Sequence, residues 1–152
     1  MDLTSELWRE QLELRCGKVA TNKLLSARVA VAGLGGLGSN IAVLLTRMGV
    51  GNLHLIDFDK VDYSNLQRQQ YFVEQVGACK VEALAETLRK INSYVNLRLS
   101  CVKVNEENLP ELLAEEEIIC EAFDKAEAKA MLVNGVLEHF PGKVIVAGSG
   151  MA

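Results

Sequence analysis

Short apolar runs alternate along the chain with segments in which apolar residues recur every three or four positions. The runs, rich in Val, Ile and Leu, predict strands at residues 28–32, 53–57, 97–104, 118–122 and 143–147. The segments between them predict helices at residues 37–48, 77–92, 108–115 and 125–139. Strands that alternate with helices are joined by right-handed crossovers into a parallel sheet. We therefore predict an α/β fold, with helices on both faces of one parallel sheet.

The residues before the first strand follow a different pattern. Residues 4–15 predict an amphipathic helix, and residues 17–26 predict a linker. This divides the chain into an N-terminal helical arm and linker at 1–26 and an α/β domain at 27–152. The chain stops in a glycine-rich turn, residues 148–152, directly after the fifth predicted strand. A finished domain seldom ends at that edge of its sheet, so we expect a truncated chain or one segment of a longer protein.

Three local signals refine this picture. Gly49 follows the helix at 37–48 in the position where a helix commonly ends. The helix at 77–92 carries apolar residues at core spacing, namely Val81, Leu84, Leu88 and Ile91. Residues 58–73 predict a long polar loop, and loops of that length within compact domains are usually functional.

Composition and charge exclude several classes of protein. The chain has 152 residues, 49% of them hydrophobic, which is enough for a core without disulfides or metals. Its net charge of −4 argues against nucleic acid as the main partner. Without an early apolar run or a stretch long enough to span a membrane, we expect a cytoplasmic protein with no membrane partner. None of the four cysteines forms a Cys-x-x-Cys pair, so the chain has no zinc motif.

A glycine-rich turn joins the first predicted strand to the following helix. Its glycines are Gly33, Gly35, Gly36 and Gly38. Such a turn brings backbone N–H groups and the positive end of a helix against a phosphate. Asp57 ends the next strand 19 residues after Gly38, where an acid can accept hydrogen bonds from ribose hydroxyls. The pattern predicts a Rossmann-like nucleotide-binding domain, although the glycines alone fit NAD and FAD enzymes equally well.

Other charged residues have simpler explanations when each is taken alone. Asp57 could be a turn residue, and Asp124 could cap the helix after it. Arg68 could be a solvated loop charge and Lys80 an exposed helix residue. Only a joint pattern can assign them to a site.

Four motifs in order supply that joint pattern. They are the glycine turn at 33–38, Asp-x-Asp at 57–59, Ser-Asn-Leu-x-Arg-Gln at 64–69 and Val-Gly-x-x-Lys-Val at 76–81. With these motifs the sequence resembles the ThiF/MoeB family, the bacterial relatives of ubiquitin-activating enzymes, and most closely a ThiF-like member. The resemblance covers essentially the whole chain, as the front part of the family fold.

The resemblance implies adenylation by Mg-ATP of the C-terminal glycine carboxylate of a small ubiquitin-like sulfur carrier. The products are an acyl-adenylate and pyrophosphate. Arg68 and Lys80 would hold the triphosphate, and Asn65 would donate to phosphate oxygens. Asp57 would hold the ribose, and Asp59 and Gln69 would join the glycines in binding the nucleotide. Asp124 would hold Mg²⁺, a hard cation that prefers carboxylate oxygen.

Arg9 lies 24 residues before Gly33, where family members carry an arginine that reaches the ATP site of the neighbouring subunit. That role implies a homodimer. The simpler alternative is an arginine on the polar face of a helix. Two departures from the family pattern follow Asp124, because Lys125 and Lys129 stand where many members have asparagine and arginine. The family's paired zinc motifs are absent, and none of the four cysteines matches its acceptor cysteine.

We therefore predict an adenylyltransferase that acts on a ThiS-like carrier in thiamine or related sulfur metabolism. A tRNA-modifying adenylating dehydratase of the same superfamily is an alternative, although its tRNA calls for a basic surface. An NAD(H)-dependent oxidoreductase would explain the glycines and Asp57 but would leave Asn65, Arg68 and Lys80 without a role. A non-catalytic partner subunit would have no need of a phosphate and metal set.

Overall fold

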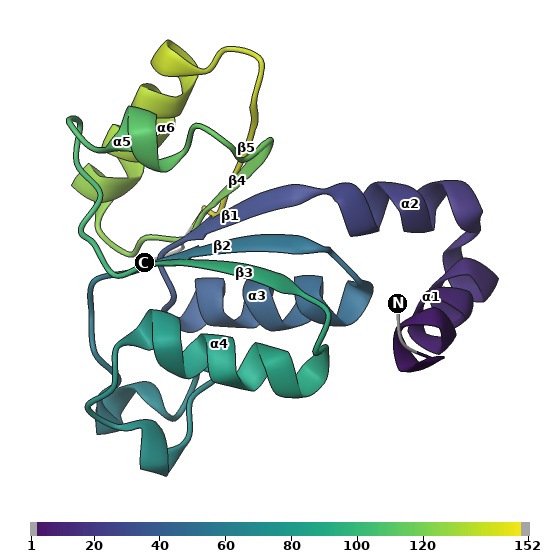
Figure 1. The fold of residues 1–152 in the computed structure, drawn as a ribbon. Coiled ribbons are helices and arrows are strands. Elements are labelled where there is room, and N and C mark those ends of the chain that lie inside the picture. Colours follow the sequence, from purple (N-terminus) through teal and green to yellow (C-terminus); the bar gives the residue numbers. More distant parts are fainter. Residues whose placement is uncertain (1–2, 150–152) are drawn as a thin grey trace.

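The computed structural model describes residues 3–149, which form an α/β fold around one parallel sheet. The strands are β1 (Arg28–Ala32), β2 (Asn52–Ile56), β3 (Asn96–Ser100), β4 (Ile118–Glu121) and β5 (Val144–Ala147). They are parallel and lie in the order β3-β2-β1-β4-β5 (Figure 1). The predicted fold class is confirmed. Because β1 pairs with both β2 and β4, its carboxyl end is the point where strand order reverses and ligands bind such sheets.

Helices cover both faces of the sheet (Figure 1). On one face lie α3 (Gly36–Met48) and α4 (Lys80–Ile91), and on the other lie α5 (Leu109–Leu112) and α6 (Ala126–His139). The first core packs Leu55 of β2 with Leu84 and Leu88 of α4, all fully buried. The second packs Ile119 of β4 with Leu132 of α6. Burying apolar surface on both faces fixes the sheet between the two helix layers.

The helix signals of the sequence agree with the structure. Gly49 ends α3 in the left-handed region at φ 90°, where its N–H bonds to the Thr46 carbonyl. In α4, the predicted core positions Val81, Leu84 and Leu88 are buried. The helix begins at Lys80 rather than at 77, because Gly77 adopts φ 91° and so cannot be helical.

The predicted linker over residues 17–26 is wrong. Residues Lys18–Ser26 form a second helix, α2, which follows α1 (Leu3–Cys16) after one non-helical residue, Gly17 at φ 80°. The sequence did not indicate this helix because its one buried residue, Thr21, is polar, and its apolar residues are exposed or half-buried. The Gly51 N–H bonds to the Leu24 carbonyl, so α2 joins the sheet at the amino ends of the strands.

Apart from α2 and α4, the elements begin and end within one residue of the prediction, except at β3, at α5 and in the loop at 58–73. β3 ends at Ser100 instead of 104, and α5 is a single turn instead of residues 108–115. The predicted loop at 58–73 includes a 3₁₀ turn, η1 (Tyr63–Asn65), and a second one, η2 (Val73–Gln75), starts at its end. Residues 150–152, part of the final glycine-rich turn, lie outside the described residues. Among residues 3–149, no helix combines the length and apolar character needed to cross a membrane.

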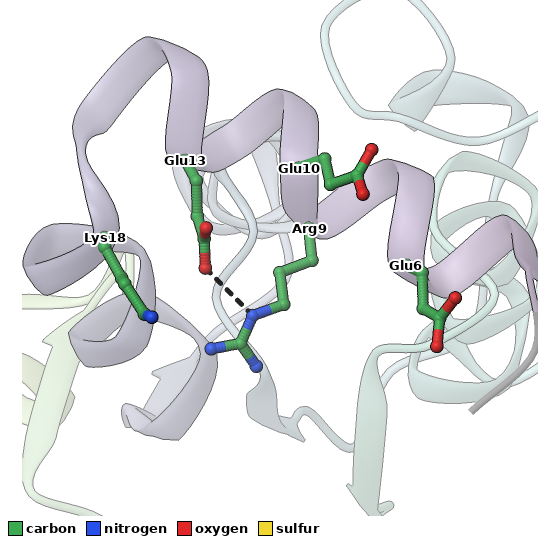
Figure 2. A pocket seen from close by; sticks show the side chains of 5 residues that line it. All are labelled: Glu6, Arg9, Glu10, Glu13 and Lys18. Carbon is green, nitrogen blue, oxygen red and sulfur yellow. Dashed lines mark hydrogen bonds and ion pairs between the residues drawn. The ribbon is translucent and has the colours of Figure 1, made fainter.

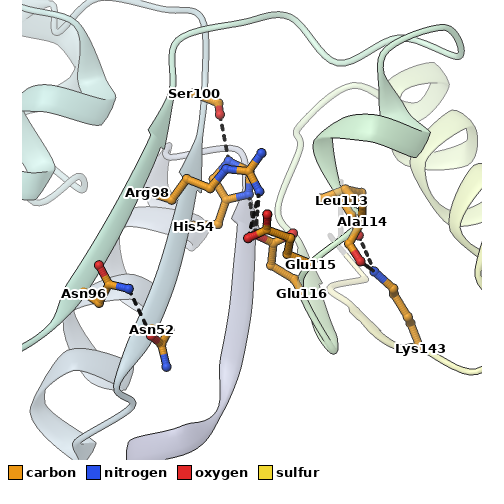
Figure 3. Close-up of polar contacts among 10 residues, drawn as sticks. All are labelled: Asn52, His54, Asn96, Arg98, Ser100, Leu113, Ala114, Glu115, Glu116 and Lys143. Carbon is orange, nitrogen blue, oxygen red and sulfur yellow. Dashed lines mark hydrogen bonds and ion pairs between the residues drawn. The ribbon is translucent and has the colours of Figure 1, made fainter.

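A buried polar contact ties β2 to the segment before β4 (Figure 3). His54 Nδ1 lies 2.8 Å from Glu116 Oε1, and His54 Nε2 lies 2.7 Å from the Ser100 hydroxyl. Arg98 Nη1 lies 3.4 Å from the same Glu116 oxygen. Burial alone would raise the pKa of Glu116, but its hydrogen bond to His54 and the charges of His54 and Arg98 hold that pKa below its ordinary value of 4.5.

Replacing Gly38 by alanine should destabilise the fold. A Cβ at Gly38 would lie 1.6 Å from the Gly33 carbonyl oxygen, so the backbone of the turn would have to move. We expect a loss of about 1–3 kcal/mol in the free energy of unfolding, measured by urea titration. The control is Gly142→Ala, because a Cβ there meets nothing within 4 Å. Equal stability of the two variants would contradict the close packing of the turn.

The Glu116 contact should make stability depend on pH. Its pKa is lower in the folded chain, so the contact stabilises the fold above pH 4.5 and is lost as the pH falls through the folded-state pKa. In urea titrations from pH 7 to pH 3, Glu116→Gln should flatten this acid-side loss of stability. The exposed Glu106→Gln should keep the slope of the unaltered chain. An unchanged slope in Glu116→Gln would refute the prediction.

Candidate nucleotide-binding site

The glycine turn forms the start of α3 at the carboxyl end of β1. Gly35 precedes the helix, and its carbonyl accepts the first helical hydrogen bond, from the Ser39 N–H. The N–H groups of residues 36–38 therefore have no acceptor within the helix. Gly33 adopts φ 93°, and a Cβ there would lie 2.8 Å from the Ala122 carbonyl oxygen. Glycine is thus required both for the turn and for its close approach to the end of β4.

The Asp57 side chain connects the glycine turn to the end of β2 by a hydrogen bond. Its Oδ2 accepts a 2.7 Å hydrogen bond from the Leu34 N–H, and its Oδ1 accepts a 2.8 Å bond from the Asp59 N–H. Asp57 as a residue is only 9% exposed. Each oxygen retains a second lone pair for a ligand. The predicted ribose contact is compatible with this geometry, but the structure adds a positioning role that the sequence did not suggest.

Arg68 and Gln69 lie over the glycine turn. A Cβ at Gly36 would lie 3.4 Å from Arg68 Cγ and Nε, and one at Gly35 would lie 3.7 Å from Gln69 Nε2. Arg68 is exposed, with Nη1 3.2 Å from the Ser64 carbonyl. Gln69 is buried, and its Oε1 has no hydrogen-bond partner among the described residues. A guanidinium and an amide therefore border the N-terminus of α3, where an anion is favoured.

Four residues missed by the sequence analysis hold this loop against the glycine turn and α3. The Tyr71 hydroxyl donates a 2.7 Å hydrogen bond to the Leu34 carbonyl. The Gln70 N–H donates to the Ser39 hydroxyl at 3.1 Å, and Asn40 Nδ2 donates to the Arg68 carbonyl at 3.0 Å. Ser39 and Asn40 directly follow the glycines, so polar residues in the first turn of the helix were the available signal. No sequence pattern pointed to Tyr71.

The Tyr71 hydroxyl remains a hydrogen-bond donor at neutral pH. Burial, and then the negative charge of Asp57, raise the pKa of Tyr71 far above its ordinary value of 10.0. The hydroxyl therefore keeps its proton at neutral pH. Its bond to Leu34 complements the Asp57 bond, because together they engage both the carbonyl and the N–H of one residue in the glycine turn.

Asn65 lies at the end of η1, where its Oδ1 accepts a 2.8 Å hydrogen bond from the Asp62 N–H. The Asp62 carboxylate in turn accepts hydrogen bonds from Ser64, and these bonds lower the pKa of Asp62. This reciprocal cap orients the Asn65 amide and leaves its NH₂ group as a donor.

Lys80 and Asp124 complete the predicted set from two other elements. Lys80 begins α4, and its N–H bonds to the Asp59 carbonyl at 3.0 Å. Its side chain is 6% exposed, with no hydrogen-bond or ion-pair partner within residues 3–149. Asp124 lies in the bend after β4, exposed and likewise without a partner in the described part of the chain. The glycine turn and the ends of β2 and β4 thus meet at one edge of the sheet.

Arg9 lies on α1 and is not part of this cluster within one chain. Its Nε lies 3.0 Å from Glu13 Oε1, and Nη2 donates to Asn22. Arg9 and Glu13, with Glu6 and Glu10 of the same helix and Lys18 of α2, line an open pocket of about 320 Å³ (Figure 2). Helix α1 packs at the opposite end of α3, where Leu12 contacts Gly49. Arg9 could meet a glycine turn only in another copy of the chain.

No group of three or more His, Cys, Asp or Glu side chains in residues 3–149 is arranged to hold a metal ion. A lone carboxylate such as Asp124 is nevertheless suited to Mg²⁺, which commonly binds one or two carboxylates together with substrate phosphates and water.

Comparison with known proteins agrees with this geometry. Residues 9–151 match the ThiF family. The chain is 37% identical to the molybdopterin-synthase adenylyltransferase of Haemophilus influenzae, over 72% of this chain and 46% of the relative. It is 36% identical to the sulfur carrier protein ThiS adenylyltransferase of Bacillus subtilis, over 87% of this chain and 40% of the relative. It therefore spans less than half the length of these two relatives.

The chain also matches a solved structure of known function. The chain superposes with a TM-score of 0.88 and 28% identity on the Escherichia coli tRNA N6-threonylcarbamoyladenosine dehydratase TcdA in complex with ATP. The match covers 95% of this chain and 60% of that protein. With its motifs, its fold and most of its length in agreement, the chain belongs to the ThiF family.

Proposed function

We propose that this chain is the nucleotide-binding part of an adenylyltransferase that uses Mg-ATP to activate the C-terminal glycine carboxylate of a ubiquitin-like sulfur carrier. The observation that carries the proposal is the position of Arg68 over Gly36. An enzyme that binds a dinucleotide such as NAD requires only the glycine turn and an acid such as Asp57 for that binding. Arg68 adds a cation beside the turn, which a triphosphate requires, and the Asn40 side chain holds the Arg68 backbone carbonyl there.

The chemistry needs electrostatic assistance rather than a general base. A C-terminal carboxylate has a pKa of roughly 3.3–3.7 and is already ionised at neutral pH. The obstacle is the approach of this anion to the polyanionic triphosphate. Arg68 and Lys80 would offset the charge that develops on the phosphates, and the Asn65 amide would donate to phosphate oxygens. Asp57 and Asp59 would hold the ribose side, with Gln69 beside the glycines.

Asp124 is the residue we propose for Mg²⁺. Its carboxylate is exposed at the carboxyl edge of the sheet and pairs with no described residue. When bound, the metal would neutralise part of the phosphate charge. The residues of the chain would then need only to bind and orient the triphosphate and the carrier carboxylate.

The proposal also covers the oligomeric state of the protein, the pathway of its carrier and its location in the cell. A homodimer would let Arg9 of one copy enter the site of the other, because Arg9 is remote from the site of its own chain. The ThiS adenylyltransferase of Bacillus subtilis, a relative at 36% identity, supports a carrier of thiamine metabolism. A cytoplasmic location agrees with the four cysteines, which are all free.

A second candidate is a tRNA-modifying dehydratase. The likeness to TcdA, at a TM-score of 0.88, favours it. Such an enzyme would use the same glycine turn and Arg68 for ATP but would need a basic surface for RNA. The net charge of −4 makes it the weaker candidate.

Replacing Arg68 by alanine should abolish adenylation. Without the guanidinium, the triphosphate loses a charge that stabilises the transition state, and we expect a loss of about 100-fold or more in ATP–pyrophosphate exchange with a carrier. The stability of the variant should be close to that of the unaltered chain, because Arg68 is exposed.

The matched control is Arg89→Ala, which removes an exposed arginine in the last turn of α4. It should leave exchange unchanged. Full exchange activity in Arg68→Ala would show that the assigned role is wrong. Exchange that depends on added tRNA rather than on a carrier would favour the dehydratase.

A further inference from the structure

A buried ion pair lies behind the candidate magnesium ligand. Glu121, the last residue of β4, has a side chain with no exposed surface, and its Oε2 lies 2.9 Å from Lys129 Nζ. Lys129 lies in the first turn of α6. The pair therefore joins the end of the strand to the start of the helix, across the bend that contains Asp124.

The same two side chains bind the backbone of that bend. Glu121 Oε1 accepts a 2.7 Å hydrogen bond from the Phe123 N–H. Lys129 Nζ donates a 2.9 Å bond to the Phe123 carbonyl. Both backbone polar groups of the residue before Asp124 are thus held by one ion pair. The direction in which Asp124 leaves the bend depends on these two bonds.

Two unfavourable electrostatic effects offset each other in this ion pair. A cation in the first turn of a helix is disfavoured by the helix dipole, and a buried carboxylate is costly unless it is paired. Lys129 and Glu121 offset each other, and each also satisfies a backbone group. Lys129 is thereby engaged with Glu121 and Phe123 rather than left available for a phosphate.

The clamped bend also packs on the glycine turn. The Cβ that Gly33 lacks would meet the Ala122 carbonyl oxygen at 2.8 Å and the Phe123 ring at 3.1 Å. A shift of the bend would therefore move its contact with Gly33 as well as Asp124. We propose that Glu121 and Lys129 form a positioning pair, which fixes the Asp124 carboxylate relative to the phosphate-binding glycine turn.

The expected effect on nucleotide binding rests on the proposed function, because it assumes that the chain binds Mg-ATP. The contacts of Glu121 and Lys129 with the Phe123 backbone, called the clamp below, do not depend on that function. The test uses the double variant Glu121→Met/Lys129→Met in the full chain. Replacing a buried ion pair by apolar side chains of similar volume is often neutral for stability, so the variant should fold. The control is Glu86→Gln/Lys90→Gln, which removes an exposed pair with a 3.0 Å contact on α4.

Two measurements are made on each protein. Amide hydrogen exchange at Phe123 reports on the clamp, and calorimetry with Mg-ATP reports on the site. In the double variant we expect faster exchange at Phe123 and about 10-fold weaker Mg-ATP binding, the size expected when a supporting contact of a ligand-binding group is lost. Lys129→Arg, which keeps the charge and the donors, should retain both properties.

A folded double variant with unchanged Phe123 exchange and unchanged Mg-ATP affinity would overturn the inference. If the double variant does not fold, Glu121→Gln serves instead, because it keeps the volume and an acceptor for Phe123 while removing the charge. It should weaken Mg-ATP binding in the same direction, and unchanged binding would again overturn the inference. If the unaltered chain does not bind Mg-ATP, the proposed function fails, and Phe123 exchange alone decides whether the clamp exists.

Discussion

The Asp57 carboxylate connects the elements that make up the candidate site. It accepts hydrogen bonds from the N–H of Leu34 in the glycine turn and from the N–H of Asp59, which begins the long loop. One buried side chain therefore fixes both the turn and the loop that carries Arg68. The Tyr71 hydroxyl reaches back from the far part of the loop to the Leu34 carbonyl. Removal of the Asp57 carboxylate would leave a buried N–H unpaired, which is costly because little water can reach it.

The local charge of the site differs from that of the whole chain. The chain carries a net charge of −4, yet the edge with the glycine turn offers a helix N-terminus and the Arg68 side chain. A phosphate group is attracted by such a concentrated positive field even when the protein as a whole is acidic. An acidic net charge is therefore compatible with the proposed binding of a nucleotide at this site.

Much of the fold could be predicted because local patterns and burial agree. The five apolar runs became five parallel strands, and Gly49 ended its helix as expected. Helix α2 could not be predicted, since its one buried position, Thr21, is polar and its apolar residues form no buried face. Within the site, spacing brought the glycines and Asp57 together. The contacts of Tyr71, Glu121 and Lys129 with backbone groups needed the structure, because no side-chain motif encodes such contacts.

We propose that the glycine turn, with Arg68 above it, binds ATP rather than a dinucleotide. Calorimetric titration of the chain with Mg-ATP and, separately, with NADH tests this claim most directly. We predict saturable binding of Mg-ATP and much weaker binding of NADH. Preferential binding of NADH would contradict the claim and would favour an oxidoreductase.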